Sequence, residues 1–265
     1  MDSLQNIKDE IEKKTNPGDR LIKGIWSIDC LYNPAGNGRI FNYKILLTQT
    51  SGLGCAYSTH TDYPVGMLES YIGRDILDIK ITDVPMLVSM YDSCYAGACE
   101  VKPAYTAEAG GVSEKKMRWR SEIIIAEAKR ILGNLKGKRV VNVGVVGDII
   151  RVFQESGADV CGTDFDAAIV GKRMFDAVDV YDGKDTLGLV KEANLCVVTG
   201  MTVATRTIDA IIEHCNQCGS KIIMFAETGA NLGGYYSAHG VDVYLGETFP
   251  FYIFNGRSEI SVYKK

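Results

Sequence analysis

The sequence lacks the marks of a membrane protein or a nucleic-acid-binding protein. No apolar run approaches the ~20 residues that a membrane-spanning helix requires. The formal net charge of −4 gives no sign of a basic surface for nucleic acid or an anionic membrane. The first residues, MDSLQNIKDEIEKK, are charged and have no apolar core of the kind found in signal peptides. We therefore expect a cytoplasmic protein without membrane or nucleic-acid partners.

Motifs for a catalytic serine elbow or for nucleotide hydrolysis are also missing. The sequence contains neither G-x-S-x-G nor the phosphate loop G-x-x-x-x-G-K-[ST]. His60 and His239 have no recognisable partner near them in the sequence. These absences favour chemistry that a bound cofactor carries, with the protein supplying position and electrostatics.

Cysteine, by contrast, is abundant, with 8 residues in a chain of 265. Without an export signal, we expect free thiols rather than a disulfide framework. Cys215-x-x-Cys218, beside His214, has the spacing of half a metal site, and Cys94 with Cys99 would have to supply the other half. Because an isolated C-x-x-C pair often has no ligand, we predict no metal site and keep metal binding as the alternative.

The apolar pattern of residues 1–111 predicts a small α+β domain, in which strands come first and helices follow. The segment NPAGNG, between the first two predicted strands, is typical of a hairpin turn. Residues 104–112 are small, polar and glycine-bearing, so we place the domain junction there. The predicted elements are a helix over 2–14, strands over 20–32, 39–48 and 52–60, and helices over 65–72 and 84–98.

Residues 112–265 have the pattern of a second, larger domain. A long helix over 113–133, with Ser113 as its N-cap, leads into it, and the basic residues near its start are expected to form a solvated face. Buried strands then alternate with helices, which predicts a mostly parallel sheet with helices on both faces. The basic residues are Lys115, Lys116, Arg118 and Arg120, and the later strands are predicted over 176–181, 193–199, 221–226, 241–245 and 258–263.

Residues 138–166 predict a nucleotide-binding unit of the Rossmann-like kind. The order is strand, glycine turn, helix, strand and acid, with the acid about 20 residues after the turn, where a ribose-binding carboxylate is expected. The features are a strand over 139–146, Gly144 and Gly147 in the turn, Asp148 as helix N-cap, a strand over 158–162, Asp164 as the first choice for the ribose and Asp166 as the second.

The glycine turn also indicates the kind of ligand. It has the form G-x-x-G rather than G-x-G-x-x-G, which leaves less room for a pyrophosphate. This favours S-adenosylmethionine (SAM), which has no diphosphate, over a dinucleotide. In the alternative interpretation, the glycines only make a tight turn and the acids cap a loop.

Four loops are expected to meet at the carboxyl edge of the sheet, where open α/β sheets bind ligands. The loops are rich in Gly, Thr, Asp or Glu, whereas the strands before them are apolar, as a small-molecule pocket requires. Glu227 ends a buried strand, where burial would raise its pKa and suit it to proton transfer; alternatively, it accepts backbone hydrogen bonds. Thr199 and Thr202 either contact a ligand or cap the next helix. The loops are 144–148, 162–166, 199–205 and 227–233.

Longer segments of this domain resemble known families. Residues 199–212, TGMTVATRTIDAII, are similar to a pattern of the family described as heavy-metal chelation proteins, which joins an enolase-N-terminal-like domain to a Rossmann-like one. Residues 222–242 resemble the same family, except that Glu227-Thr228-Gly229 stands where it usually has Gly-Pro-Ser. That departure, the length, the cysteine usage and the glycine turn resemble the HcgC family, the SAM-dependent pyridinol methyltransferases of iron-guanylylpyridinol (FeGP) cofactor biosynthesis in methanogens.

The second resemblance implies transfer of a methyl group from SAM to a ring carbon of a hydroxypyridine (a pyridinol). We also expect a homodimer. Two alternatives stay open: a non-catalytic heavy-metal- or small-ligand-binding protein, and a nicotinamide-dependent oxidoreductase, which the incomplete glycine fingerprint disfavours. The predicted catalytic residues are Thr199, Thr202, Glu227 and Thr228, and the predicted SAM-binding residues are Gly144, Val145, Gly147, Asp148, Thr163, Asp164, Gly200 and Met201.

Overall fold

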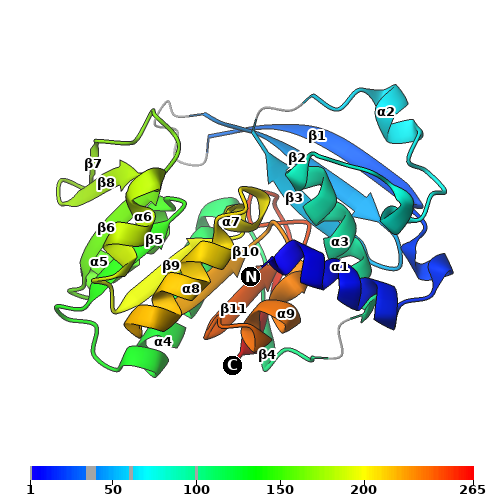
Figure 1. The fold of residues 1–265 in the computed structure, drawn as a ribbon. Helices are drawn as coiled ribbons and strands as arrows, with labels where there is room; N and C mark the ends of the chain where they lie inside the picture. Colours follow the sequence, from blue (N-terminus) through cyan, green and yellow to red (C-terminus); the bar gives the residue numbers. More distant parts are fainter. Residues whose placement is uncertain (1, 34–39, 60–61, 99–100) are drawn as a thin grey trace.

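The chain forms two sheets joined through a buried interface (Figure 1). A computed structural model describes residues 2–33, 40–59, 62–98 and 101–265. In these residues a three-stranded antiparallel sheet precedes a nine-stranded, mostly parallel one. The mixed α/β fold predicted from the sequence is therefore confirmed. No helix of the described segments is long and apolar enough to cross a membrane.

The large sheet is doubly wound around strand β5. From β5 the chain first adds strands on one side, through β6 and β8, and then crosses to the other side for β9, β10 and β11. The point where the strand order reverses therefore lies between β5 and β9. In spatial order the strands are β4 (Tyr105–Ala109), β12 (Ser258–Lys264), β11 (Val243–Glu247), β10 (Lys221–Ala226), β9 (Leu195–Thr199), β5 (Arg139–Val143), β6 (Asp159–Asp164), β8 (Val178–Asp182) and β7 (Arg173–Met174).

Both faces of this sheet are covered because its central strands are apolar on both sides. In β10, Ile223 and Phe225 pack in the core under helices α4 (Ser113–Leu132) and α5 (Gly147–Glu155). The alternate residues Ile222 and Met224 belong to the opposite core. That core is covered by α6 (Thr186–Val190), α7 (Met201–Ala204), α8 (Ile208–Cys218) and α9 (Gly233–Ala238).

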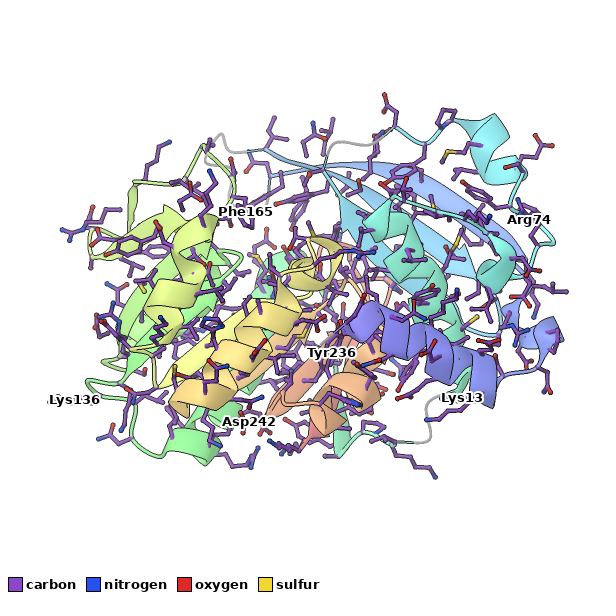
Figure 2. All side chains as sticks on the ribbon, in the orientation of Figure 1. Lys13, Arg74, Lys136, Phe165, Tyr236 and Asp242 are labelled. Carbon is purple, nitrogen blue, oxygen red and sulfur yellow. The ribbon has the colours of Figure 1, made fainter. Side chains whose placement is uncertain are left out.

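The N-terminal part follows the predicted order of strands and helices. Its antiparallel meander packs on the long apolar helix α3, which also contacts α1 (Figure 1). The hydroxyl of Tyr236 on α9 donates a hydrogen bond to Ser3 at the start of α1 (Figure 2). This bond connects α1 to the core beneath α6, α7, α8 and α9. The elements are α1 (Ser3–Lys14), β1 (Gly24–Tyr32), β2 (Phe41–Gln49), β3 (Leu53–Ser58), α2 (Val65–Glu69) and α3 (Val84–Ala98), with short 3-10 turns η1 (Pro17–Arg20), η2 (Ile76–Asp78), η3 (Gly183–Asp185) and η4 (Ala230–Leu232).

Several predicted boundaries are wrong for local physical reasons. Strand β5 ends at Val143 instead of residue 146, because Gly144 has a φ of +75° and turns the chain away from the sheet. Helix α5 is preceded by Val146, so Asp148 lies inside its first turn and is not the N-cap. Helix α4 likewise follows Val112 rather than taking Ser113 as its cap. The expected junction at 104–112 contains β4, which pairs with β12 at the edge of the large sheet.

The basic residues near the start of α4 do not form the solvated face that was predicted. Lys115 is exposed, but Lys116 is 0% exposed and Arg120 is 3% exposed. The ammonium of Lys116 donates to the carbonyl oxygens of Phe251 and Phe254 and to Ser258 Oγ, at 2.9 Å for the last. Lys116 therefore fixes the aromatic loop, residues 248–257, which follows β11.

Replacement of Lys116 should destabilise the protein strongly. Lys116→Met leaves the buried acceptors of Phe254 and Ser258 without a donor, so we expect the free energy of unfolding to fall by about 2–4 kcal/mol. Denaturant titration would measure the loss. Lys115→Met, one position away on the exposed side, should change the stability by less than about 0.5 kcal/mol. Equal effects of the two substitutions would show that the contacts of Lys116 are not stabilising.

A buried carboxyl group joins the two parts of the chain. Asp92 on α3 accepts hydrogen bonds from the amides of Cys55 in β3 and Asn231 in η4, both at 2.8 Å. Asp92 is 0% exposed, and burial raises its pKa from 3.8 to about 7, against the opposing effect of these two amides. The junction between α3 and the large sheet therefore contains a titrating group.

The raised pKa of Asp92 makes stability depend on pH. The unfolded chain releases this proton near pH 4, whereas the folded chain keeps it until about pH 7. Stability should therefore fall as pH rises from about 4 to 7, with a slope of up to about 1.4 kcal/mol per pH unit from this group. The free energy of unfolding, measured across that range, should depend less steeply on pH in Asp92→Asn than in the wild-type protein. The control Asp179→Asn, at an exposed position, should keep the wild-type slope.

Candidate functional site

The glycine turn lies where the strand order of the large sheet reverses. The Gly144 amide donates to the carbonyl of Thr163 in β6, and a β-carbon on Gly144 would overlap Thr199 Oγ1 at the end of β9. Buried Asn142 fixes the turn further, since it accepts from the Val146 amide at 2.9 Å and donates to Val197 of β9 at 3.1 Å. Three adjacent strands thus hold the turn at the carboxyl edge, as predicted.

The acid after β6 is bound to this turn. Asp164 accepts from the Val145 amide at 2.8 Å with one oxygen and from the Asp166 amide at 2.9 Å with the other. These bonds match the structural interpretation, in which the acids cap a loop. A carboxylate has about four acceptor positions, so Asp164 keeps capacity for ligand hydroxyls. Thr163 is buried and accepts from Thr186 instead.

The loops after β9 and β10 are packed against each other and against the small sheet. A β-carbon on Gly200 would overlap the carbonyl oxygen of Thr228. Thr228 Oγ1 accepts from the Tyr57 amide at 2.9 Å and also lies 3.8 Å from the sulfur of Met201. Thr202 lies inside the first turn of α7 and donates to the carbonyl of Thr199 at 2.8 Å. The N-cap of this helix is Gly200, so the capping role considered for Thr202 is wrong.

Two polar atoms next to the glycine turn have no partner among the described residues. Thr199 Oγ1 is buried against Gly144 without a hydrogen bond, and Asp148 Oδ2 is buried without one in the first turn of α5. Buried polar atoms are normally paired. Two unpaired atoms beside a turn where a β-carbon would overlap Thr199 make this part of the edge a candidate ligand site. Phe165, at the end of β6, exposes 57% of its surface at the same edge (Figure 2).

A second polar group lies at the ends of β10 and β11. Arg120 Nη1 is 2.9 Å from Glu227 Oε1 and 3.8 Å from Glu247 Oε2. The guanidinium is stacked between the rings of Phe225 and Tyr252, whose centroids lie 4.7 and 3.7 Å from its carbon. We call Arg120, Glu227 and Glu247 the carboxyl cluster.

Burial controls the ionisation of the carboxyl cluster. Desolvation raises the pKa of Glu227, although Arg120 and Tyr57 act in the opposite direction. Desolvation, together with the charge of Glu227, raises the pKa of Glu247 to about 8. The raised pKa of Glu227 agrees with the prediction for a carboxyl group at the end of a buried strand.

The sequence analysis missed Arg120, Glu247, Tyr57 and Tyr252 as members of the site. A signal for Glu247 was present, because it ends an apolar parallel strand in the same way as Glu227. The strand was predicted over 241–245 and stops at Glu247 instead, so its last residue was overlooked. The two tyrosines come from the small sheet and the aromatic loop, far from the large sheet in sequence.

The structure describes three of the four cysteines considered for a metal site. Cys215 is buried on α8 whereas Cys218 is exposed, and Cys94 is buried on α3; Cys99 lies outside the described residues. Within the described segments, no group of three or more His, Cys, Asp or Glu side chains is arranged to hold a metal ion.

Two cavities, of about 340 and 350 Å³, are lined by none of the residues of the glycine turn, although the first includes Val203 of the loop 199–205. The first lies between the starts of α1 and α8, and the second is lined by the aromatic loop and Glu259. Neither includes a predicted catalytic or cofactor-binding residue.

Residues 128–243 match the model of the DUF364 family, described as "Putative heavy-metal chelation". The match supports the family resemblance for the Rossmann-like part of the chain. No curated protein matches the sequence.

Two solved structures have the same fold over nearly the whole chain. A DUF364 protein of unknown function from Desulfitobacterium hafniense DCB-2 is similar with a TM-score of 0.59 and 12% identity, covering 98% of each chain. Another, from Pyrococcus horikoshii, has a TM-score of 0.56 and 11% identity, covering 99% of this chain and 100% of its own. At these identities the similarity establishes the fold.

The close approach of Gly144 and Thr199 can be tested with a matched pair of glycines. Gly144 and Gly171 both have a φ of +75°, but a β-carbon on Gly171 would meet nothing within 4 Å. Gly171→Ala should therefore lose only the ~1 kcal/mol that a left-handed backbone costs a residue with a side chain. Gly144→Ala should lose at least about 2 kcal/mol, because Thr199 must also move. Equal losses in thermal unfolding would rule out the close approach.

Proposed function

We propose that the protein binds SAM at the carboxyl edge of the large sheet and transfers its methyl group to a ring carbon of a small hydroxypyridine. The observation that carries the ligand site is the unpaired Thr199 Oγ1 against Gly144, at the point where the strand order reverses. Open α/β sheets bind their ligands at this point. The shortened glycine turn favours a nucleoside ligand without a diphosphate.

The residues around the turn fit the nucleoside part of SAM. Asp164, at the end of β6, has acceptor capacity for ribose hydroxyls, and Thr199 Oγ1 and Asp148 Oδ2 have no protein partner. Phe165 offers an exposed ring at this edge for a base or other flat group. The backbone around the same place comes from Gly144, Val145, Gly147, Gly200 and Met201. The side chain of Thr163 is already hydrogen-bonded to Thr186.

SAM would supply an activated methyl group, and the task of the chain is to position the acceptor and exclude water. Glu227 and Thr228 follow the neighbouring strand β10, on the side where the small sheet covers the edge. The Thr202 hydroxyl donates to a backbone carbonyl, and the Thr228 hydroxyl accepts from a backbone amide. Both hydroxyls therefore hold their loops in place. The acceptor class itself comes from the resemblance to the pyridinol methyltransferases.

Thr199→Val tests the ligand site directly. The substitution keeps the shape of the side chain and removes a hydroxyl that has no protein partner. The thermal midpoint should stay the same or rise, since a buried unpaired polar atom is removed. The affinity for S-adenosylhomocysteine, measured by calorimetry, should fall about tenfold, or about 1.4 kcal/mol.

Thr205→Val, at an exposed position in the same loop, is the control and should leave that affinity unchanged. Absence of S-adenosylhomocysteine binding by the wild-type protein would refute the proposal of a SAM site. Normal affinity in Thr199→Val would instead remove only the role of Thr199.

A further inference from the structure

The carboxyl cluster contains two carboxyl groups but a single ion-pair partner within 4 Å among the described residues. Glu227 and Glu247 both pair with Arg120, at 2.9 and 3.8 Å. Two carboxylates this close to one another repel, so the pair retains a proton to a higher pH than isolated carboxyl groups. Neither oxygen of Glu247 nor Nε of Arg120 has a well-aligned hydrogen bond, although the Tyr252 amide and Ser258 lie near enough to Glu247 to oppose the rise of its pKa.

The two carboxyl groups are not equivalent. Glu247 is 0% exposed, at the end of β11, whereas Glu227 is 8% exposed and follows the end of β10. Glu227 has the shorter contact to Arg120 and also hydrogen-bonds Tyr57. The nearer guanidinium therefore favours the charge on Glu227, and that charge in turn raises the pKa of Glu247, so the proton stays on Glu247. Of the two, only Glu227 keeps any contact with solvent.

Groups from every neighbouring element face this pair. The small sheet contributes Tyr57 and Cys55 from β3 and Cys30 from β1. The aromatic loop contributes Tyr252, and Ser258 follows that loop. Lys116 lies on α4, one turn before Arg120. The ammonium of Lys116 donates to two carbonyl oxygens and to Ser258, and it lies within 4 Å of neither carboxyl group of the cluster. Arg120 is thus the cation that balances one carboxylate.

We propose that Glu227 accepts the proton of an acidic ring hydroxyl on the bound acceptor, with Glu247 kept neutral and Arg120 holding Glu227 in place. The inference rests on the proposed function. In this step the O–H bond of the ligand breaks, the proton moves to a carboxylate oxygen of Glu227, and the electron pair remains on the ligand oxygen. The ring becomes electron-rich, as attack by one of its carbons requires. Glu247 and Arg120 act as positioning residues.

The protonation of the pair can be measured without any ligand. In protein labelled with ¹³C at the glutamate carboxyl carbon, NMR titration should show a neutral carboxyl group that ionises near pH 8. Glu247→Gln should remove this signal. Glu227→Gln should lower the pKa of Glu247 by at least one unit, because the like charge is gone and Arg120 remains. Glu192→Gln, whose side chain is 70% exposed, should leave the signal unchanged.

The proton transfer is then tested with 2,4-dihydroxypyridine, whose ionisation can be followed by ultraviolet absorbance, in the absence of SAM. Binding to wild-type protein and to Glu192→Gln should raise the anionic fraction at pH 7 to a similar extent. Glu227→Gln should reduce that rise at least tenfold.

The failures are distinguishable. A pair that ionises below pH 6, a probe that does not bind, or a Glu227→Gln variant that ionises the probe normally would each overturn this inference and leave SAM binding intact. Absence of S-adenosylhomocysteine binding would overturn the proposed function, and the titration of the carboxyl pair would still stand.

Discussion

The arrangement of the candidate site depends on one guanidinium that has been removed from water. Arg120 is 3% exposed and stacks between Phe225 and Tyr252 while it pairs with two carboxyl groups. A buried cation without such partners would cost several kcal/mol. The ends of β10 and β11, the first half of α4 and the aromatic loop therefore have to meet at Arg120. This requirement also fixes the carboxyl groups of Glu227 and Glu247 beside each other.

A second constraint links the small sheet to the large one. The loop after β10 bonds to β3 through Thr228 with the Tyr57 amide and through the Gly229 amide with the Cys55 carbonyl. Asp92 adds two buried hydrogen bonds across the same junction. The N-terminal part is thus a cover for the carboxyl edge of the large sheet, and it contributes Tyr57 to the carboxyl cluster. Such a cover is suited to excluding water from a reaction at that edge.

The local features of the fold were predictable because they depend on neighbours in sequence. Buried parallel strands are continuous apolar runs, so β5, β9 and β10 were predicted, and Gly144 marked the turn because glycine adopts a positive φ at no steric cost. The carboxyl ends of neighbouring parallel strands lie at one edge of a sheet, so Thr199, Glu227 and Thr228 were expected at the same edge. Strands β9 and β10 do pair in parallel, with Thr199 opposite Phe225. Strand and helix ends were less certain, since a cap such as Val146 has no distinctive side chain.

The residue pattern alone predicts a mostly parallel sheet with helices on both faces, the glycine turn and the polar loops at the carboxyl edge. Which charges are buried depends instead on how distant elements pack. Lys115 and Lys116 are neighbours with the same charge, yet one is exposed and the other contacts the aromatic loop more than 130 residues away. The pairing of Arg120 with Glu227 and Glu247 spans a similar separation. Such contacts leave no periodic trace in the sequence, because they depend on where distant elements pack.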